Sequence, residues 1–254
     1  MISMGIEKVE NLIIGAGIAG LGAGYELRRK NKDCVIIERN DSYGGLLDNF
    51  VVDGFRFDKF IHLSFTKSEE VRQIFDKTPY HTHHPLSYNY YKGYWLKHPA
   101  QNNIYPLPSE EKQKIIDGFD KRPFKTIEEI KDYDEWLRVQ YGDYFAENFP
   151  LVYTKKYWTV DAKDLETNWI GSRMYKPSIE EIKQGAETSE TPNTYYAKEM
   201  RYPKEGGYKS FLKPLRKGLD IRFNQKVVDI DTMNNIVKTI SGDVFQYENL
   251  INTM

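Results

Sequence analysis

The stretch that decides the fold is LIIGAGIAG at residues 12–20, followed by the apolar run VIIE that ends on Glu38. An apolar strand that leads through glycines into a helix, and then a second apolar strand, is the β-α-β unit of a dinucleotide-binding domain. In such a unit Gly15 permits the tight turn, Gly17 lets a pyrophosphate approach the backbone, and Gly20 lets the helix pack on the strand. The helix N-terminus offers free N–H groups and a positive dipole end to the phosphates.

An acidic residue at the end of the second apolar run completes this pattern. Glu38 lies 18 residues beyond Gly20, where a carboxylate accepts a hydrogen bond from a ribose hydroxyl. A glycine turn alone is weak evidence, because such turns are common. Strand, turn, helix, strand and acid together predict a dinucleotide site.

A second glycine pair follows the acid. The segment ERNDSYGG at 38–45 ends on Gly44 and Gly45, and residues without a Cβ let a second loop approach a cofactor. An ordinary loop after the second strand is the alternative. The order ER-x4-GG resembles the large FAD superfamily that contains amine oxidases, protoporphyrinogen oxidase and UDP-galactopyranose mutase, whereas NAD-binding Rossmann domains usually lack this extension. The resemblance implies FAD as cofactor, held by Gly15, Gly17, Ala19, Gly20, Glu38, Arg39, Gly44, Gly45 and Leu46.

The composition argues against several classes of protein. The 254 residues include 36 basic and 37 acidic ones, a formal net charge of −1. This charge balance does not indicate a basic surface that would bind nucleic acid. No segment approaches the length of unbroken apolar sequence that a membrane span needs. The single cysteine, Cys34, is predicted to be a core residue of an apolar strand, and a chain without disulfides fits a reducing cytoplasm. His81, His83 and His84 have no cysteine or paired carboxylates nearby, so we predict no metal site.

The order of patterns along the chain predicts an α/β protein, with a Rossmann-type FAD-binding domain interrupted by a mainly helical, substrate-side insert. We expect the nucleotide domain to comprise residues 1–80 and 203–254, and the insert residues 81–202. Hairpin turns are predicted at Asp53-Gly54 and at Lys92-Gly93. Each of these pairs ends in glycine and lies between two strand-like runs.

Helical and strand-like patterns subdivide the remainder of the chain. Residues 109–149 read as helical, with Thr126 as an N-cap and Glu129 as its capping-box partner. Residues 161–200 read as irregular and polar. The alternation in IRFNQKVVDI at 221–230 predicts a strand added to an open sheet.

Three further segments resemble UDP-galactopyranose mutases in order and approximate spacing. FIHLSFT at 60–66 is similar to their G-P-H-x-F-H-T segment. VYTKKYWTVDAKDLETNWIGSRM at 152–174 resembles their Y-T-x-K-x-W-G-x-D-P-x-x-L stretch, which ends in an arginine. YPKEGGYKSFLKPL at 202–215 resembles their P-x-x-GGY-T segment. The resemblance therefore covers nearly the whole chain, and YTKKYW with DAKDL is its most specific part.

The resemblance implies roles for five residues. His62 would lie against the flavin, Tyr153 and Trp158 near the nucleotide or sugar, and Arg173 would pair with the diphosphate, since a guanidinium fork suits two anionic oxygens. His62 and Arg173 are thus the predicted catalytic residues. Val227 falls where this superfamily uses backbone groups to hold the adenine. Four of these roles have an alternative: His62 satisfying a backbone group, Trp158 anchoring the insert's core, Arg173 as a solvated loop residue, and Val227 as a strand core residue.

The activity implied by the resemblance is the isomerisation of a UDP-sugar for cell-surface polysaccharide of the lipopolysaccharide type. In that family reduced FAD attacks the anomeric carbon through N5, UDP leaves, and the ring opens and recloses smaller without net redox change. A second reading is an oxidoreductase like the amine oxidases or protoporphyrinogen oxidase, which needs neither Trp158 nor Arg173. The sequence gives no oligomeric state.

Some residues depart from the family pattern. Phe65 stands where the mutases have a second histidine, and Thr159 replaces the glycine after Trp158. The chain stops at LINTM, where the superfamily continues with more substrate domain and a Gly-Asp segment that touches the FAD. The expectation from this ending is a shortened form or fragment of the family plan, and a third reading is therefore an inactive remnant with part of the FAD cradle absent.

Overall fold

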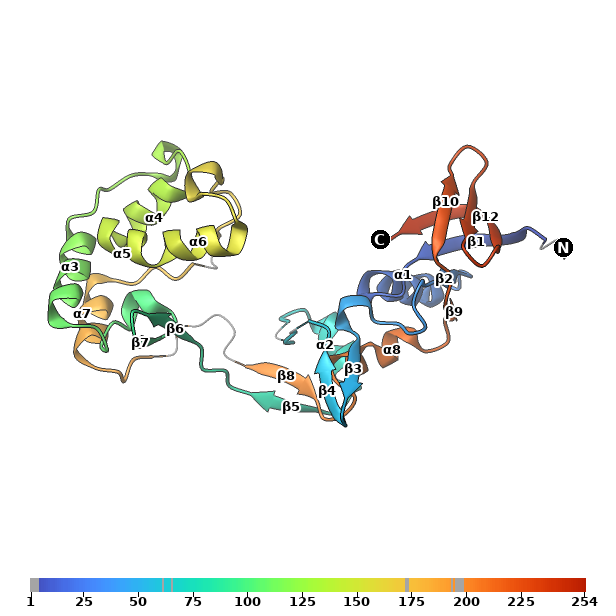
Figure 1. The fold of residues 1–254 in the computed structure, drawn as a ribbon, viewed down its shortest axis with the longest axis horizontal. Coiled ribbons are helices and arrows are strands. Elements are labelled where there is room, and N and C mark those ends of the chain that lie inside the picture. The colour runs from blue at the N-terminus through green and yellow to red at the C-terminus, as the bar shows by residue number, and fades with distance from the viewer. Residues whose placement is uncertain (1–4, 61, 65, 172–173, 193, 195–198) are drawn as a thin grey trace. The chain divides into compact units, whose positions relative to one another are not determined.

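The computed structural model describes residues 5–60, 62–64, 66–171, 174–192, 194 and 199–254 (Figure 1). The chain forms two compact units, Met1–His83 with Glu199–Met254, and His84–Lys198. Each unit has its own hydrophobic core.

A six-stranded mixed sheet, in the order β10-β11-β12-β1-β2-β9, organises the first unit (Figure 1). The adjacent pairs β12–β1, β1–β2 and β2–β9 are parallel. The pairs β10–β11 and β11–β12 are antiparallel. The last four residues of β1 are buried, as expected of a strand covered on both faces. The strands are β1 (Glu7–Ile14), β2 (Val35–Ile37), β9 (Asp220–Arg222), β10 (Val227–Asp231), β11 (Ile236–Thr239) and β12 (Val244–Asn252). The α/β Rossmann-like class predicted from the sequence is confirmed.

Helices and two short strand pairs complete the first unit. β3 and β4 form the predicted hairpin, and Asp53 and Gly54 both have positive φ, 50° and 83°, as a two-residue hairpin turn of this kind requires. The short pair β5–β8 joins Tyr80 to Pro203. The elements are α1 (Ile18–Arg29), η1 (Gly45–Leu47), β3 (Asn49–Val52), β4 (Phe55–Asp58), α2 (Glu69–Phe75), β5 (Tyr80–His83), β8 (Met200–Pro203), η5 (Tyr208–Leu212) and α8 (Lys213–Arg216).

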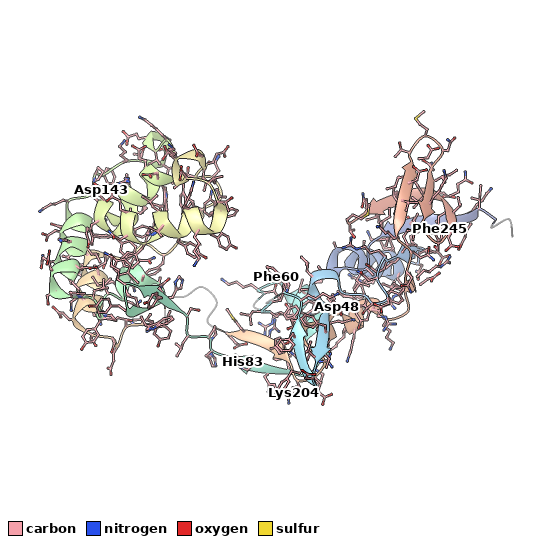
Figure 2. The ribbon with its side chains drawn as sticks, viewed as in Figure 1. Asp48, Phe60, His83, Asp143, Lys204 and Phe245 are labelled. Atoms are coloured by element: carbon pink, nitrogen blue, oxygen red, sulfur yellow. The ribbon has the colours of Figure 1, made fainter. Side chains whose placement is uncertain are left out.

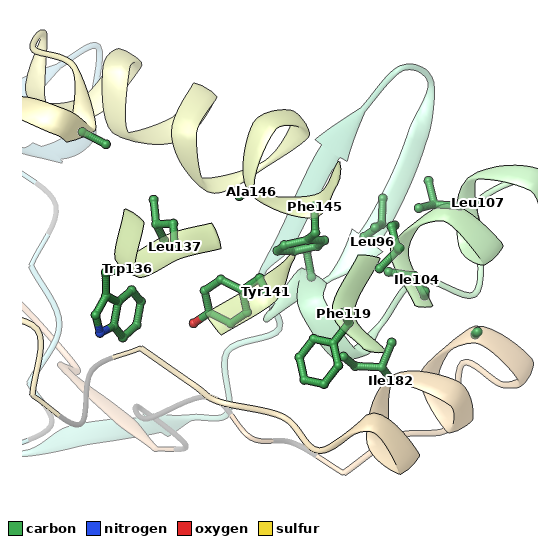
Figure 3. Packing of buried hydrophobic residues seen from close by; sticks show 14 of the residues in the cluster. Leu96, Ile104, Leu107, Phe119, Trp136, Leu137, Tyr141, Phe145, Ala146 and Ile182 are labelled. Atoms are coloured by element: carbon green, nitrogen blue, oxygen red, sulfur yellow. The ribbon is translucent and has the colours of Figure 1, made fainter. Parts of the chain in front are cut away.

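The second unit is mainly helical around an aromatic core. Figure 3 shows Tyr141 and Phe145, from two successive helices, whose ring centroids lie 5.7 Å apart. The Tyr141 hydroxyl donates to the Tyr175 carbonyl at 2.8 Å, so its polar end is satisfied inside the core. The elements are β6 (Tyr88–Tyr91), β7 (Tyr94–Lys97), η2 (Ala100–Asn102), α3 (Ser109–Asp120), η3 (Ile127–Glu129), α4 (Tyr133–Tyr141), α5 (Asp143–Asn148), α6 (Pro150–Trp158), η4 (Ala162–Asp164) and α7 (Ile179–Glu187). The β6–β7 pairing around Lys92-Gly93 confirms the second predicted hairpin.

The helical pattern after Thr126 is more broken than predicted. The Thr126–Glu129 capping box is present, but it begins only the single turn η3. A new helix starts after Asp132, whose side chain accepts a hydrogen bond from the Glu135 N–H, and Gly142 ends it. Gly142 has φ +77°, and a Cβ there would lie 2.4 Å from the Gly118 carbonyl carbon, so the chain must break at this glycine.

The prediction that residues 161–200 are irregular is wrong for part of that range. Helix α7 (Ile179–Glu187) lies within it and packs Ile182 into the core. Ser178 and Glu181 form a complete capping box at its start. The sequence contains this signal as Ser-x-x-Glu before a helical run. It was missed because the flanking residues are polar.

The single strand predicted over 221–230 is also wrong. The segment contains two strands at opposite edges of the sheet, because β9 pairs with β2 while β10 pairs with β11. Asn224, with φ +59°, interrupts the extended backbone between them. Cys34 directly precedes β2 instead of lying in it and is only half-buried, and this burial raises the pKa of its thiol.

Two general properties follow for the described part of the chain. No helix there is long and apolar enough to cross a membrane. Within the same residues, no three histidine, cysteine or acidic side chains gather in a way that would hold a metal ion. His81 and His83 lie on β5 and are exposed.

Candidate dinucleotide-binding site

The first glycine turn connects the end of β1 to α1 beside the end of β2. Gly15 has φ +101°, and its N–H donates to the Ile37 carbonyl at 2.8 Å. A Cβ on Gly20 would lie 1.9 Å from the Gly15 carbonyl oxygen. These two glycines are thus required by backbone geometry and close packing, as the sequence pattern predicts.

Gly17 faces open space at the start of α1. A Cβ added there would meet no atom within 4 Å, so this glycine is not required by packing within the chain. The first helical hydrogen bond runs from Leu21 N–H to Gly17 oxygen at 2.9 Å, which leaves the preceding N–H groups without helical acceptors. The first turn of α1 carries no acidic residue, and Ile18 and Ala19 are exposed. An open, positively polarised helix end of this kind fits a pyrophosphate.

Glu38 directly follows β2 and is only 5% exposed. Its Oε2 accepts from the Ala16 N–H at 2.8 Å, which ties the acid to the first glycine turn. Its Oε1 accepts from the backbone N–H and side-chain amide of Asn40, at 2.9 and 2.8 Å. A carboxylate accepts about four hydrogen bonds, so capacity remains for a ribose hydroxyl. Nothing in the sequence pattern singled out Asn40, whose contribution depends on this local turn.

The second glycine loop lies against the first glycine turn. Gly44, with φ +116°, donates its N–H to the Ala16 carbonyl at 2.8 Å, and Gly17 and Gly44 form a parallel bridge. A Cβ on Gly45 would lie 3.3 Å from the Gly17 Cα. The two glycine segments therefore meet, and two residues predicted beside them, Arg39 and Leu46, are exposed.

His62 lies next to the segment that follows β8. Its Nδ1 is 2.9 Å from the Phe60 carbonyl oxygen, which is the backbone contact anticipated as an alternative. Its ring centroid lies 5.4 Å from that of Tyr208 in η5. The His62 side chain is partly exposed. Phe65, the departure from the family's second histidine, lies outside the described residues.

Val227 begins β10 and is half-buried against the sheet. Two residues earlier, the Gln225 N–H donates to the Glu38 carbonyl at 2.8 Å. The backbone that leads into Val227 therefore passes directly beside Glu38. The predicted adenine contact requires such proximity.

In the second unit, α6 carries an exposed run of aromatic side chains. Tyr153 and Tyr157 stack at 5.5 Å with an interplanar angle of 14°, Tyr157 meets Trp158 at 5.3 Å, and Trp158 meets Trp169 at 6.1 Å. Trp158 is 49% exposed, so it is not the core anchor considered as its alternative. The sequence reasoning missed Tyr157 and Trp169. The spacing of Tyr153 and Tyr157, one helical turn apart, was a usable signal.

Thr159 ends α6 in the left-handed region, with φ +63°. A glycine, as in the resembled pattern, would adopt that conformation without a Cβ penalty, whereas a β-branched threonine is strained there. Arg173, predicted to bind the diphosphate, lies outside the described residues.

Comparison with known proteins agrees with the geometry of the first unit. Residues 13–78 match the model of the NAD(P)-binding Rossmann-like domain. The crystal structure of reduced UDP-galactopyranose mutase is similar with a TM-score of 0.87 and 25% identity, over 97% of this chain and 55% of that one. Residues 13–78 therefore form a Rossmann-like dinucleotide-binding domain, and the fold of the chain is similar to that of the reduced mutase. The dinucleotide-binding, Rossmann-type domain predicted from the glycine turn is thereby confirmed.

Other proteins are similar to this chain in fold or over a shorter segment. A putative protoporphyrinogen oxidase from Exiguobacterium sp. 255-15 has a TM-score of 0.59 at 16% identity, over 98% of this chain and 60% of that one. The 1-hydroxycarotenoid 3,4-desaturase of Flavobacterium sp. (strain P99-3) is 45% identical over 47 residues, 18% of this chain and 10% of that protein. The chain thus spans a little over half the length of the solved structures it resembles.

Proposed function

We propose that this chain binds FAD and acts, like UDP-galactopyranose mutase, on a nucleotide sugar. The observation that carries the proposal is the 0.87 TM-score to the reduced mutase over 97% of the chain, because it includes the second unit as well as the Rossmann domain. The fold of the first unit alone would fit any member of the superfamily.

The residues of the first unit fit the parts of FAD as follows. The Gly15–Gly20 turn and the open start of α1 would hold the pyrophosphate, and the buried Glu38 carboxylate the ribose. Gly44 and Gly45 let the second loop approach, and the backbone at Val227 would contact the adenine. When bound and reduced, FAD supplies the nucleophile for the anomeric carbon of the sugar. His62, packed on Tyr208, is the proposed flavin neighbour.

The aromatic run on α6 is the proposed surface for the substrate's rings. Tyr153, Tyr157 and Trp158 are 61%, 64% and 49% exposed, and aromatic side chains of this kind stack on a base or on the apolar face of a sugar. Arg173 is proposed to pair with the diphosphate on the strength of the sequence resemblance alone. The wider setting we propose is the supply of a sugar for surface polysaccharide in a reducing cytoplasm, which fits a chain whose one cysteine is unpaired.

The test begins with the chain purified in the presence of FAD and reduced with dithionite. We expect a stoichiometric complex that is yellow before reduction. After reduction we expect saturable binding of UDP and interconversion of the pyranose and furanose forms of a UDP-hexose. An FAD complex that neither binds UDP nor interconverts the two forms would refute the nucleotide-sugar assignment. Peroxide release with an amine, unaffected by Arg173→Ala, would favour the amine-oxidase alternative.

A further inference from the structure

A buried ion-pair cluster lies beneath the second glycine loop. The side chain of Asp48 is 7% exposed, with Oδ1 2.7 Å from the Lys209 ammonium and Oδ2 3.0 Å from the Lys59 ammonium. Lys209 also donates to the Ser42 hydroxyl, and its Nζ lies 4.4 Å from the centre of the Tyr43 ring. Figure 2 labels Asp48, which directly precedes the β3–β4 hairpin. A buried carboxylate is tolerated only with such partners.

Lys209 holds both ends of the glycine loop. Ser42 and Tyr43 directly precede Gly44, and Asp48 follows the single turn η1, so the contacts of one ammonium bracket Gly44-Gly45. The loop needs such support, because both glycines have positive φ, 116° and 58°, and glycine in an unfolded loop has many other conformations.

Lys209 is also a departure of this chain from the resembled pattern. It follows GGY at the position where the mutase segment P-x-x-GGY-T has threonine. The chain therefore places a charge where the family pattern places a hydroxyl. Asp48 supplies the matching acid from a segment 161 residues away in sequence.

We propose that the Asp48–Lys209 ion pair is a positioning device, which fixes the second glycine loop against the first glycine turn in the geometry that admits the dinucleotide. The contact it preserves is the bond from the Gly44 N–H to the Ala16 carbonyl, 2.8 Å long. Neither residue needs to touch the cofactor. The inference rests on the proposed binding of FAD but concerns an arrangement that exists without it.

The charge on Asp48 gives this device a pH dependence. Burial raises the pKa of the Asp48 carboxyl, but hydrogen bonds from Lys209, Lys59 and the Asn49 N–H outweigh burial and hold that pKa below its usual range. A carboxyl with a lowered folded-state pKa stabilises the fold above its unfolded pKa, and this contribution disappears as pH falls through the folded value. The other titratable or charged groups nearby are Tyr43, packed under Lys209, and Arg216, 4.8 Å from the centre of the Tyr43 ring.

The experiment compares Asp48→Asn, Lys209→Met and the double variant in the full chain. FAD affinity is measured by flavin fluorescence titration, and hydrogen exchange of residues 42–48 is measured without FAD. We expect each single variant to bind FAD about tenfold more weakly, with faster exchange at Gly44. The loss in the double variant should be clearly smaller than the sum of the two single losses, because the Asp48–Lys209 interaction is removed in all three.

Matched controls separate this role from general effects of charge. Asp53→Asn changes an exposed carboxylate in the β3–β4 turn, and Lys213→Met an exposed ammonium at the start of α8. Both should leave FAD affinity and exchange at residues 42–48 unchanged. If a cluster variant fails to fold, the wild-type chain provides the test. After correction for intrinsic exchange rates, the protection of the Gly44 N–H from hydrogen exchange should fall as pH drops through the Asp48 pKa.

The outcomes distinguish this inference from the proposed function. A wild-type chain that binds no FAD refutes the proposed function, while exchange at Gly44 still tests the ion pair. If FAD binds and both single variants match the wild type in affinity and in exchange of residues 42–48, the positioning role is refuted. Additive losses in the double variant would also refute it, since they would show two independent effects.

Discussion

The two units use opposite means to present a candidate site. In the first unit the surface offered to a ligand is backbone: glycines that cannot carry a Cβ, free N–H groups at the start of α1, and a buried acid beside them. In the second unit it is side chains, in the exposed aromatic run on α6. A backbone site requires particular residues for steric reasons and tolerates little change. A side-chain surface can be altered with little effect on the fold, and this difference makes the comparison testable.

The largest expected effect is in the first glycine turn. Gly20→Ala would place a Cβ 1.9 Å from the Gly15 carbonyl oxygen, a contact that only backbone movement can relieve. We expect a loss of about 3 kcal/mol or more in the free energy of unfolding, together with loss of FAD binding, measured by urea denaturation and fluorescence titration. The control is Gly22→Ala in the same helix, which meets no atom within 4 Å and should stabilise the chain by about 0.5 to 1 kcal/mol. Equal free energies of unfolding for the two variants would refute the steric explanation for Gly20.

The second prediction separates cofactor binding from folding within the same turn. Gly17→Ala adds a methyl group to open space, so the free energy of unfolding without FAD should stay nearly constant. FAD binding should weaken by about 2 kcal/mol, because the methyl group occupies the pyrophosphate's approach to the backbone. A titration with FAD measures the affinity, and urea denaturation measures the free energy of unfolding. Unchanged affinity would mean that the pyrophosphate does not lie over Gly17.

The third prediction concerns the aromatic run of the second unit. Trp158→Ala should change the free energy of unfolding and FAD affinity little, since the side chain is half exposed, but weaken UDP binding by about 1 to 2 kcal/mol through lost stacking. Trp95→Ala is the matched control, because Trp95 is 62% exposed on β7 of the same unit. Isothermal titration of the reduced holoprotein with UDP measures the difference. The same loss in both variants would argue against a specific role for α6.

The smallest expected effect is at the end of α6. Thr159→Gly should stabilise the chain by about 1 kcal/mol, since the left-handed conformation at φ +63° strains a β-branched residue. Asn224→Gly, at a similar φ of +59°, should stabilise it less, because asparagine tolerates this region. Thermal unfolding of both variants gives the comparison. A destabilised Thr159→Gly variant would show that the threonine side chain makes stabilising contacts that exceed the cost of its backbone strain.

The comparison also explains what the sequence could predict. The first glycine turn and Glu38 were predictable because their roles follow from local backbone geometry within one β-α-β unit. The Asp48–Lys209 pair was not, because its partners are 161 residues apart and only the fold brings them together. The split of residues 221–230 into two edge strands was hidden for a similar reason, since alternation predicts an extended backbone but does not indicate where a positive φ at Asn224 interrupts it.

The parallel pairing of β12 with β1 has a consequence for the order of folding. Asn249 donates its side-chain amide to Asn11 at 3.2 Å across 238 residues of sequence, and the Thr253 N–H and hydroxyl both reach the Ile14 carbonyl directly before the glycine turn. Contacts of such separation form slowly, because the entropy of closing the intervening chain is lost first. On the ribosome, the second unit has emerged before β1 gains this neighbour. The nucleotide-binding turn therefore reaches its final structure late in the folding of the chain.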